Sequence, residues 1–169
     1  MPLTKIQSLG ITDGTIVNAD INASAAIAGT KLSGAGKVLQ VVTATDDTER
    51  TTTSTSFVTS TGLSLSITPS SASNKIFLVS SHTGYNSTAA QITFYTLYRN
   101  STNLGATNGF GIWRQGDTTD ETCISMSHLD SPSSTSAITY AVYFKVSANT
   151  GYVNKGSLKG TLTAFEIAG

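Results

Sequence analysis

Charge, cysteine, histidine and long apolar runs are all scarce in this chain of 169 residues. Charged residues make up 12% of the chain, and ten Lys and Arg balance ten Asp and Glu, so the formal net charge is zero. Because no run of basic residues occurs, the composition argues against a protein that binds nucleic acid through charge. No apolar stretch reaches the length of a membrane span, and the N-terminus lacks the features of a signal peptide. We therefore expect neither nucleic acid nor a membrane among its partners.

The residues that commonly carry catalysis are also few. Cys123 is the one cysteine, so no intrachain disulfide forms, and we expect it to be a small buried hydrophobic residue. The two histidines, His82 and His128, each lie beside apolar neighbours, and we expect both to be packed in the protein or at an interface. No nucleophile elbow, P-loop, zinc-protease or dinucleotide-binding motif occurs. The sequence predicts a protein that is not an enzyme and that has no cofactor.

Two acidic stretches, at residues 46–49 and 117–121, are the remaining candidates for ion binding. Neither has the ligand spacing of a known calcium loop, so we interpret both as solvated loops and predict no metal site. Whether either binds a cation is left open by the sequence.

Hydroxyl side chains take the place of charge in this chain. It contains 28 threonines and 23 serines, while the 38% of hydrophobic residues fall mainly in short alternating runs. This composition is typical of a β-protein with an uncharged, hydroxylated surface. The length fits one main domain with a small appendage.

Large aliphatic side chains recur near the N-terminus at steps of five residues, with one step of six. Neither a helix nor a half-buried strand has this period, and the residues between them favour turns. Burying one such side chain gains about 1.5–3 kcal/mol, whereas fixing each backbone residue costs about 1–2 kcal/mol. We therefore predict that residues 1–37 are an anchor or stalk that becomes ordered only against sister copies or a scaffold. The predicted anchoring residues are Ile6, Ile11, Ile16, Ile21, Ile27 and Leu32.

Residues 38–169 alternate between apolar and polar side chains over many short segments. About eight to ten strands are expected, joined by loops rich in Ser, Thr, Gly and Pro, and residues 43–56 are read as a long loop or a water-facing edge strand. The predicted fold is all-β, an antiparallel β-sandwich with a jelly roll as the favoured topology. The apolar content exceeds the need of a monomeric sandwich, which indicates association through a sheet. The main strand segments expected are 37–42, 63–68, 75–82, 91–99, 110–113, 123–129, 138–147, 152–153 and 161–167.

Aromatic residues on and between these strands have two interpretations that the sequence leaves open. Tyr85, Tyr95, Tyr98 and Trp113 are able to stack on sugar rings or to fill the core or a subunit interface. The candidate receptor-contact residues are Tyr85, Phe110, Trp113, Asp117 and Asp120.

Two blocks of the chain resemble a known family. They are ITDGTIVNADINASAAIAGTKLSGAGKVLQVV at residues 11–42, and FVTSTGLSLSITPSSASNKI together with YRNSTNLG and LDSPSSTSAITYAVYFKV in the body. In these blocks the chain resembles small fibre-like or decoration virion proteins of tailed bacteriophages, particularly those that infect cyanobacteria and other aquatic bacteria. The resemblance implies a homotrimer with a jelly-roll-like head and an N-terminal segment that interlocks about the threefold axis or sits on the virion.

From the predicted anchor and this resemblance we expect a structural virion protein, made in the host cytoplasm and located in the virion. Its expected partners are two further copies of itself and the major capsid protein or another virion protein. Tail fibres of this kind carry a larger N-terminal part, so the short start favours a capsid decoration, cement or head-fibre protein. The alternative is a tail-fibre or head-fibre protein that recognises glycans on the host surface.

Overall fold

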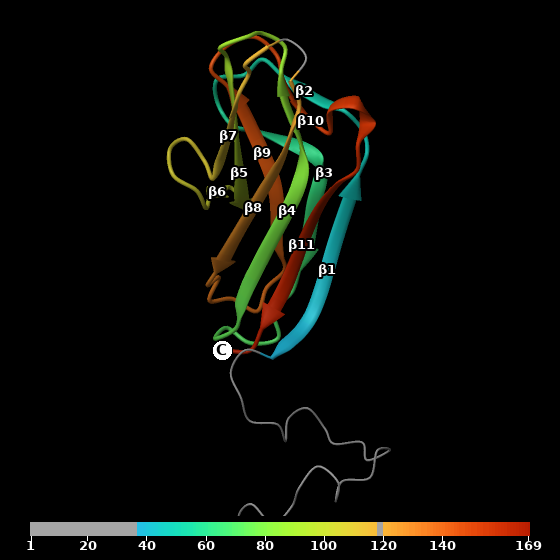
Figure 1. The fold of residues 1–169 in the computed structure, drawn as a ribbon. Helices are drawn as coiled ribbons and strands as arrows, with labels where there is room; N and C mark the ends of the chain where they lie inside the picture. Colours follow the sequence, from blue (N-terminus) through green and yellow to red (C-terminus); the bar gives the residue numbers. More distant parts are fainter. Residues whose placement is uncertain (1–36, 118–119) are drawn as a thin grey trace, which may run out of the picture. The chain divides into compact units, whose positions relative to one another are not determined.

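The computed structural model describes residues 37–117 and 120–169, which all belong to one compact unit, Ala35–Gly169. This part of the chain is built from β-strands and includes one short 3₁₀ turn, Lys155–Ser157 (Figure 1). The strands are β1 (Val38–Asp46), β2 (Arg50–Thr52), β3 (Val58–Ile67), β4 (Lys75–Asn86), β5 (Ile92–Arg99), β6 (Thr102–Asn103), β7 (Gly111–Arg114), β8 (Thr122–Asp130), β9 (Ile138–Val146), β10 (Gly151–Val153) and β11 (Gly160–Ile167).

The strands form two antiparallel sheets. Sheet A contains the neighbours β1, β11, β4 and β8, with β10 and β2 extending it, and sheet B contains β3, β9, β5 and β7, with β6 beside β5. Counted along the chain, the eight principal strands pair first with last, second with seventh, third with sixth and fourth with fifth. This is the pairing of one long antiparallel hairpin wound into two packed sheets, which is a jelly roll. The predicted fold class is therefore confirmed for the described residues.

The alternation of side chains explains why these segments form strands with one buried face. In β9, the inward residues Ile138, Tyr140, Val142, Phe144 and Val146 are all buried. Because successive side chains of a strand point to opposite faces, the residues between them face outward. Strand β4, which begins at Lys75, is central in sheet A, since it pairs with β11 on one side and β8 on the other.

Two strands are longer than their sequence predicts. Strand β1 continues through Thr43–Asp46, where Val42 and Ala44 turn inward and Thr43 and Thr45 face solvent. Of the two interpretations of residues 43–56, the edge strand is therefore correct for their first part. Strand β4 continues to Asn86 because β10 pairs with residues 84–86 after β11 has ended. Small and hydroxyl residues conceal the period of two in these extensions: Thr43, Ala44 and Thr45 in β1, and Thr83 and Gly84 in β4.

The core lies between the sheets and takes side chains from both. Tyr95 is fully buried, and its hydroxyl donates to the carbonyl of Tyr152 at 2.9 Å and accepts from the backbone N–H of Tyr85 at 3.1 Å. A buried ring of this size therefore leaves no polar atom unsatisfied. The core cluster comprises Leu63, Leu65, Ile67, Ile76, Leu78, Tyr95, Leu97, Ile124, Met126, Ile138, Tyr140, Val142, Phe144, Val153, Leu162 and Ala164.

The expected burial of Cys123 is wrong, because the side chain is exposed on the outer face of β8. Ile124 and Met126 occupy the inward positions of that strand, so the alternation sends Cys123 outward. Its Sγ lies 3.3 Å from Ser81 Oγ on the neighbouring strand. The packing expected for the histidines is confirmed: His82 is buried against Tyr95, and His128 lies against Phe110.

Candidate functional site

The outer face of sheet A carries a row of large apolar side chains that crosses four strands. Val41 of β1 is opposite Phe165 of β11, Phe165 is opposite Phe77 of β4, and Phe77 is opposite Leu129 of β8. Directly opposed residues of antiparallel strands project to the same face. Val41 and Leu129, at the two ends of the row, are 53% and 48% exposed.

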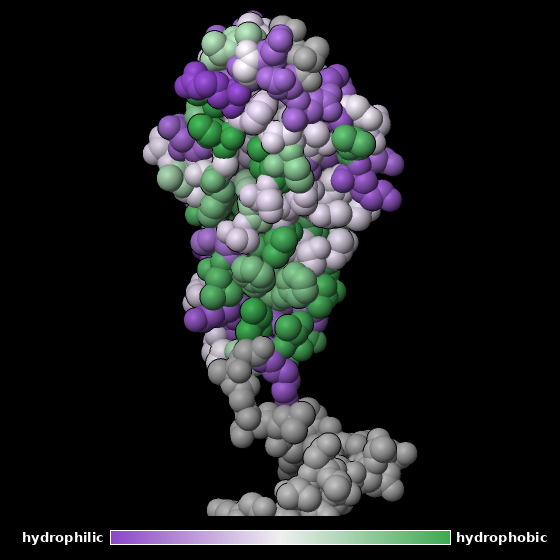
Figure 2. All heavy atoms as spheres, in the orientation of Figure 1, coloured by the Kyte–Doolittle hydropathy of each residue, from purple (hydrophilic) through white to green (hydrophobic). Residues whose placement is uncertain are grey.

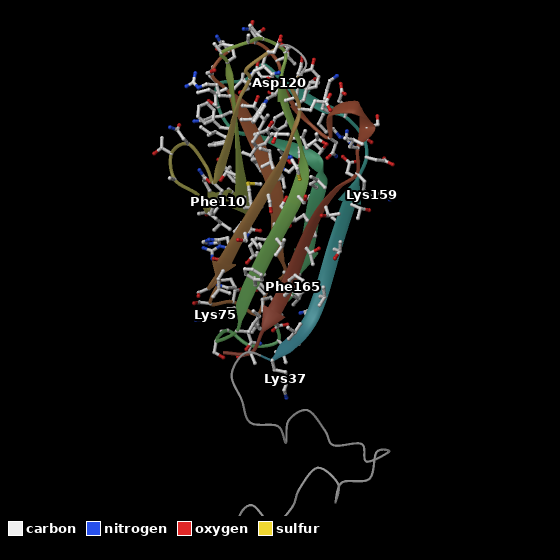
Figure 3. All side chains as sticks on the ribbon, viewed as in Figure 1. Lys37, Lys75, Phe110, Asp120, Lys159 and Phe165 are labelled. Atoms are coloured by element: carbon white, nitrogen blue, oxygen red, sulfur yellow. The ribbon has the colours of Figure 1, made fainter. Side chains whose placement is uncertain are left out.

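A second apolar pair adjoins this row. Val38, which is 52% exposed, pairs with Ile167 at the end of the sheet where β1 begins. Figure 2 shows hydrophobic side chains gathered toward this end of the face, and Figure 3 places Phe165 between Lys75 and the lower part of β1. We call this surface the apolar band, and it consists of Val38, Val41, Phe77, Leu129, Phe165 and Ile167.

Hydroxyl side chains cover the same sheet beyond the apolar band. Two residues further along the strands, the row is Thr43, Thr163, Val79 and Ser127, and the row after that is Thr45, Thr161, Ser81 and Ser125. Thr43 and Thr163 share a hydrogen bond of 3.0 Å across the β1–β11 pair. Apart from Val79, the two rows next to the apolar band are therefore polar and uncharged.

A buried carboxylate lies behind the apolar band and holds β1 in place. Glu166 is 1% exposed and accepts hydrogen bonds from Gln40 Nε2 at 2.6 Å, from the backbone N–H and hydroxyl of Ser70 at 2.7 Å each, and from Asn74 Nδ2 at 2.5 Å. Burial alone would raise the pKa of Glu166, but these donors lower it to about 2. The charged carboxylate therefore links the edge strand to the 70–74 loop at the end of the sheet that carries the apolar band.

The outer face of sheet B is aromatic, but its rings pack on one another. Tyr98 and Tyr143 stack with centroids 3.9 Å apart, and Phe57 meets Tyr98 edge-on at 6.3 Å. Lys145 Nζ lies 4.6 Å from the centroid of the Phe57 ring and 5.1 Å from that of Phe94. Because these faces are occupied by neighbouring rings or a cation, this surface is largely self-contained. Of the aromatic residues with two interpretations, Tyr95 is in the core and Tyr98 belongs to this stack.

The structure places Tyr85 beside Tyr152, not beside the other candidate receptor contacts. The two rings meet edge-to-face with centroids 5.1 Å apart on the paired strands β4 and β10. Lys155 Nζ lies 4.8 Å from the Tyr152 centroid and 5.5 Å from that of Tyr85, and it pairs with Glu49 at 3.3 Å. Tyr85 and Tyr152 therefore form a partly exposed aromatic surface with the Lys155 cation beside it.

Phe110 and Asp120 lie at different levels of the molecule, as Figure 3 shows. Trp113 packs partly buried against the core, and its Nε1–H donates to Gln115 Oε1 at 2.9 Å. Gln115, which is 1% exposed, also donates to the carbonyls of Asp117 and Asp120 and accepts from the backbone N–H of Asn86. The predicted receptor contacts are therefore not one cluster. The sequence pattern missed Gln115, a polar residue that organises this loop from inside.

Within residues 37–117 and 120–169, no group of three or more His, Cys, Asp or Glu side chains is arranged to hold a metal ion. Two acidic residues of the 46–49 stretch have protein partners instead: Asp46 pairs with Arg50 at 3.3 Å, and Glu49 pairs with Lys155. No helix in this described part of the chain is long and apolar enough to cross a membrane. The predicted anchoring residues, Ile6 to Leu32, lie outside the described residues.

No protein-family model matches the chain, and no curated protein sequence matches it. Solved structures that match part of this chain include chains from infectious bursal disease virus. A chain of the Gt strain structure has 14% identity and a TM-score of 0.48, covering 77% of this chain and 38% of that one. A chain of the VP2 subviral particle has 13% identity and a TM-score of 0.46, covering 76% and 37%. This chain thus spans less than two fifths of those chains, and the fold assignment above depends on the strand pairing alone.

Proposed function

We propose that this chain is a structural virion protein, a capsid decoration, cement or head-fibre protein that acts as a homotrimer. Residues 1–37 attach it to the major capsid protein or another virion protein, and residues 38–169 form the displayed head. The observation that carries this proposal is the apolar band, a row of partly exposed apolar side chains across sheet A that adjoins two rows made mainly of hydroxyl side chains. Contiguous exposed apolar surface with a polar surround is typical of protein association.

The distribution of polar groups also favours assembly over chemistry. The most strongly bound carboxylate, Glu166, is occupied by four hydrogen bonds that join elements of the fold. Asp130 is likewise occupied, accepting from Arg99 Nη1 at 2.9 Å and from Tyr140 Oη at 2.6 Å. Groups held in this way stabilise a shell or head and are not available to transfer a proton.

The direct test is the location of the protein in phage particles. An affinity-tagged copy should appear by electron microscopy at regular positions on the capsid. Replacing Ile11, Ile16 and Ile21 together with Ser should detach the protein or split its trimer while the body stays folded. Exchanging Thr12, Thr15 and Asn18 for Ser is the matched control, and it should leave particle occupancy unchanged.

Particle occupancy that survives loss of the three isoleucines would contradict the proposed anchor. Gel filtration with light scattering measures the oligomeric state separately. We expect the mass of three copies at micromolar concentration. A stable monomer would contradict the trimer.

A second function, recognition of host glycans, is favoured by one observation. Tyr85 and Tyr152 form a partly exposed aromatic surface with Lys155 beside it, and aromatic rings are common platforms for sugars. Binding of the purified protein to host cells or to a glycan array, lost in Tyr152→Ala and kept in Tyr143→Ala, would support this function. A protein that serves only as cement should bind neither.

A further inference from the structure

We infer that a pocket on the outer face of sheet A binds one ring of a neutral sugar chain, beside the aromatic pair of Tyr85 and Tyr152. The inference rests on the host-glycan recognition proposed above and deepens it, since it names the pocket and the class of sugar. The pocket, which we call the hydroxyl pocket, has a volume of about 390 Å³ and lies between β4, the start of β8 and the turn before β11. The residues that define it are Ser81, Thr83, Glu121, Thr122, Cys123 and Lys159.

The hydroxyl pocket arises from a break in the strand pairing along one side of β4. Strand β11 pairs with β4 as far as Ser81, and β10 pairs with it from Gly84 onward. Among the described strands, none therefore pairs with residues 82–83 on that side. The connection from β10 to β11 leaves the sheet at this point and borders the pocket with Leu158, which is 54% exposed. The break leaves room on the sheet for a small ligand.

Hydroxyl groups and a thiol form the floor of the pocket. The alternation of β4 sends Ser81 and Thr83 to the outer face and His82 into the core, where its ring packs on Tyr95. Cys123 is opposite Thr83, and its Sγ lies 3.3 Å from Ser81 Oγ. Each serine or threonine hydroxyl both donates and accepts hydrogen bonds, as each sugar hydroxyl does. The floor therefore matches a ligand whose surface consists of hydroxyl groups.

One acidic and one basic residue lie on opposite sides of the pocket. Glu121 precedes β8 and Lys159 precedes β11, and these two strands flank β4. Figure 3 shows Lys159 on the side of β11. Neither residue forms an ion pair with another residue in the part of the chain that the structure describes. The carboxylate accepts hydrogen bonds from sugar hydroxyls and the ammonium donates to them, while the two charges cancel. This balance favours a neutral sugar over a uronic acid or an amino sugar.

The size of the pocket and its position beside Tyr85 indicate how a sugar chain lies on the sheet. A volume of about 390 Å³ is near the lower end of the range for small-ligand sites, about 300–1,000 Å³, so the pocket takes one sugar ring. Tyr85 follows Thr83 on the same face of β4, about 7 Å further along the strand. The next ring of the chain therefore lies on the Tyr85–Tyr152 pair, where the ion pair of Lys155 and Glu49 is also neutral overall.

The hydroxyl pocket and the apolar band are far enough apart to bind different partners at the same time. Thr83 lies six residues beyond Phe77 on β4, about 20 Å along the strand. Strand β1 begins at Val38, at the end of the sheet that carries the apolar band. A sugar site near the other end of β4 therefore stays accessible when the apolar band is covered by another protein chain.

The first test uses Cys123, the one cysteine of the chain, as a reporter inside the pocket. Its rate of alkylation by N-ethylmaleimide is measured on the full chain with neutral oligosaccharides of glucose, galactose or mannose, and with oligomers of glucuronic acid or glucosamine. We expect at least one neutral series to slow alkylation fivefold or more and the charged oligomers to leave the rate unchanged. Protection by no oligosaccharide, or equal or greater protection by the charged ones, would overturn the inference.

The control for this test moves the thiol along the same strand. Cys123→Ser combined with Ser127→Cys places it on the outer face of β8, outside the pocket. We expect this thiol to be alkylated at the same rate with and without sugar. Equal protection at both positions would show that the sugar does not occupy the pocket.

The second test alters the pocket and measures its affinity for the protecting oligosaccharide by calorimetry. Thr83→Val keeps the shape of the side chain and removes its hydroxyl, and Glu121→Gln removes the charge of the acceptor. We expect each variant to weaken binding at least fivefold. Thr45→Val, which alters an exposed threonine on the same face of the sheet, is the control and should change binding less than twofold. Equal affinities for Thr83→Val and Thr45→Val would overturn the inference, and circular dichroism verifies that all three variants are folded.

These outcomes are separable from the fate of the proposed glycan recognition. If Tyr152→Ala abolishes binding to host cells while the pocket variants keep it, glycan recognition stands and the hydroxyl pocket is not its site. If neutral oligosaccharides protect Cys123 but the protein does not bind host cells, the inference is supported and recognition of the host is contradicted.

Discussion

The two sheets differ in the polar groups of their inner faces and in the apolar groups of their outer faces. Sheet A has the polar residues Ser80, His82 and Glu166 on its inner face and has Val41 and Leu129 bare on its outer face. Sheet B has an inner face dominated by Leu, Val, Phe and Tyr, and its outer rings stack on one another. The row of partly exposed apolar side chains that crosses sheet A accords with the proposal that sheet A makes part of its apolar contact with another protein chain.

The largest change in the free energy of unfolding is expected when a polar group on the inner face of sheet A is altered. Glu166→Gln replaces a charged acceptor by an amide with one acceptor oxygen, so its NH₂ must face either Gln40 Nε2 or the donors of Ser70 and Asn74. We expect the free energy of unfolding to fall by about 2–4 kcal/mol, since charge-assisted hydrogen bonds are lost and a buried donor stays unpaired. Urea denaturation measures this change. Glu49→Gln, which breaks a partly exposed ion pair with Lys155, is the control and should cost less than about 1 kcal/mol.

Glu166 also sets an acid limit on stability. Its pKa is lowered to about 2 in the folded protein from an ordinary value of 4.5, so the folded state favours the charged form. The resulting stability is fully present above pH 4.5 and is lost as the pH falls toward 2. In Glu166→Gln, the unfolding free energy should become flatter over this pH range. An unchanged pH profile in the variant would show that the carboxylate does not hold β1.

His82 should make the stability of the fold depend on pH over a higher pH range than Glu166 does. Burial lowers its pKa to about 4, and the backbone carbonyl of Thr83 accepts from Nδ1 at 3.3 Å. Its Nε2 has no hydrogen-bond partner among the described residues. Because the unfolded chain binds the proton more readily, stability falls as the pH drops from 6.5 to 4, by up to about 3 kcal/mol. His82→Leu should remove this slope, and His128→Leu, which alters the partly exposed histidine, should keep it.

A smaller effect is expected on the outer face of sheet B. Tyr143→Ala removes the ring stacked on Tyr98, and the free energy of unfolding should fall by about 1–2 kcal/mol. The dissociation constant of the oligomer should not change, because these rings pack against one another within a single chain. Tyr143→Phe keeps the stack and is the control. An oligomer that dissociates in Tyr143→Ala would show that sheet B, and not sheet A, carries the interface.

The sequence predicts the fold well because its signal is local. Alternation in residues such as Leu63, Leu65 and Ile67 defines both a strand and its buried face, and all three are in the core. Eight such strands that pair as one long antiparallel hairpin, wound into two sheets, then take up the strand order of a jelly roll.

The candidate surfaces were harder to predict because they depend on register between distant segments. Nothing in the sequence near Val41 shows that it lies opposite Phe165, which is more than a hundred residues away. Gln115 was missed for a related reason. Its burial arises from partners on β4 and β7 and in the 117–120 loop, and not from its immediate neighbours in the chain.

The smallest expected change in stability comes from a substitution that tests whether Lys145 covers the aromatic rings on the outer face of sheet B. Lys145 Nζ lies near the rings of Phe57 and Phe94 and donates to the carbonyl of Thr107 at 3.1 Å. Lys145→Met keeps the length of the side chain but removes the cation, so we expect the free energy of unfolding to fall by about 0.5–1 kcal/mol. Lys159→Met, which alters an exposed lysine elsewhere, should be neutral.

If Lys145→Met instead increased binding of the protein to host cells, removal of the cation would have opened the ring faces to a ligand. The outer face of sheet B would then be a ligand-binding surface that Lys145 covers. Both sheets would in that case carry an interface on their outer faces. An unchanged binding level, together with the small loss of stability, keeps sheet B as a structural face and leaves the apolar band of sheet A as the surface through which the protein assembles.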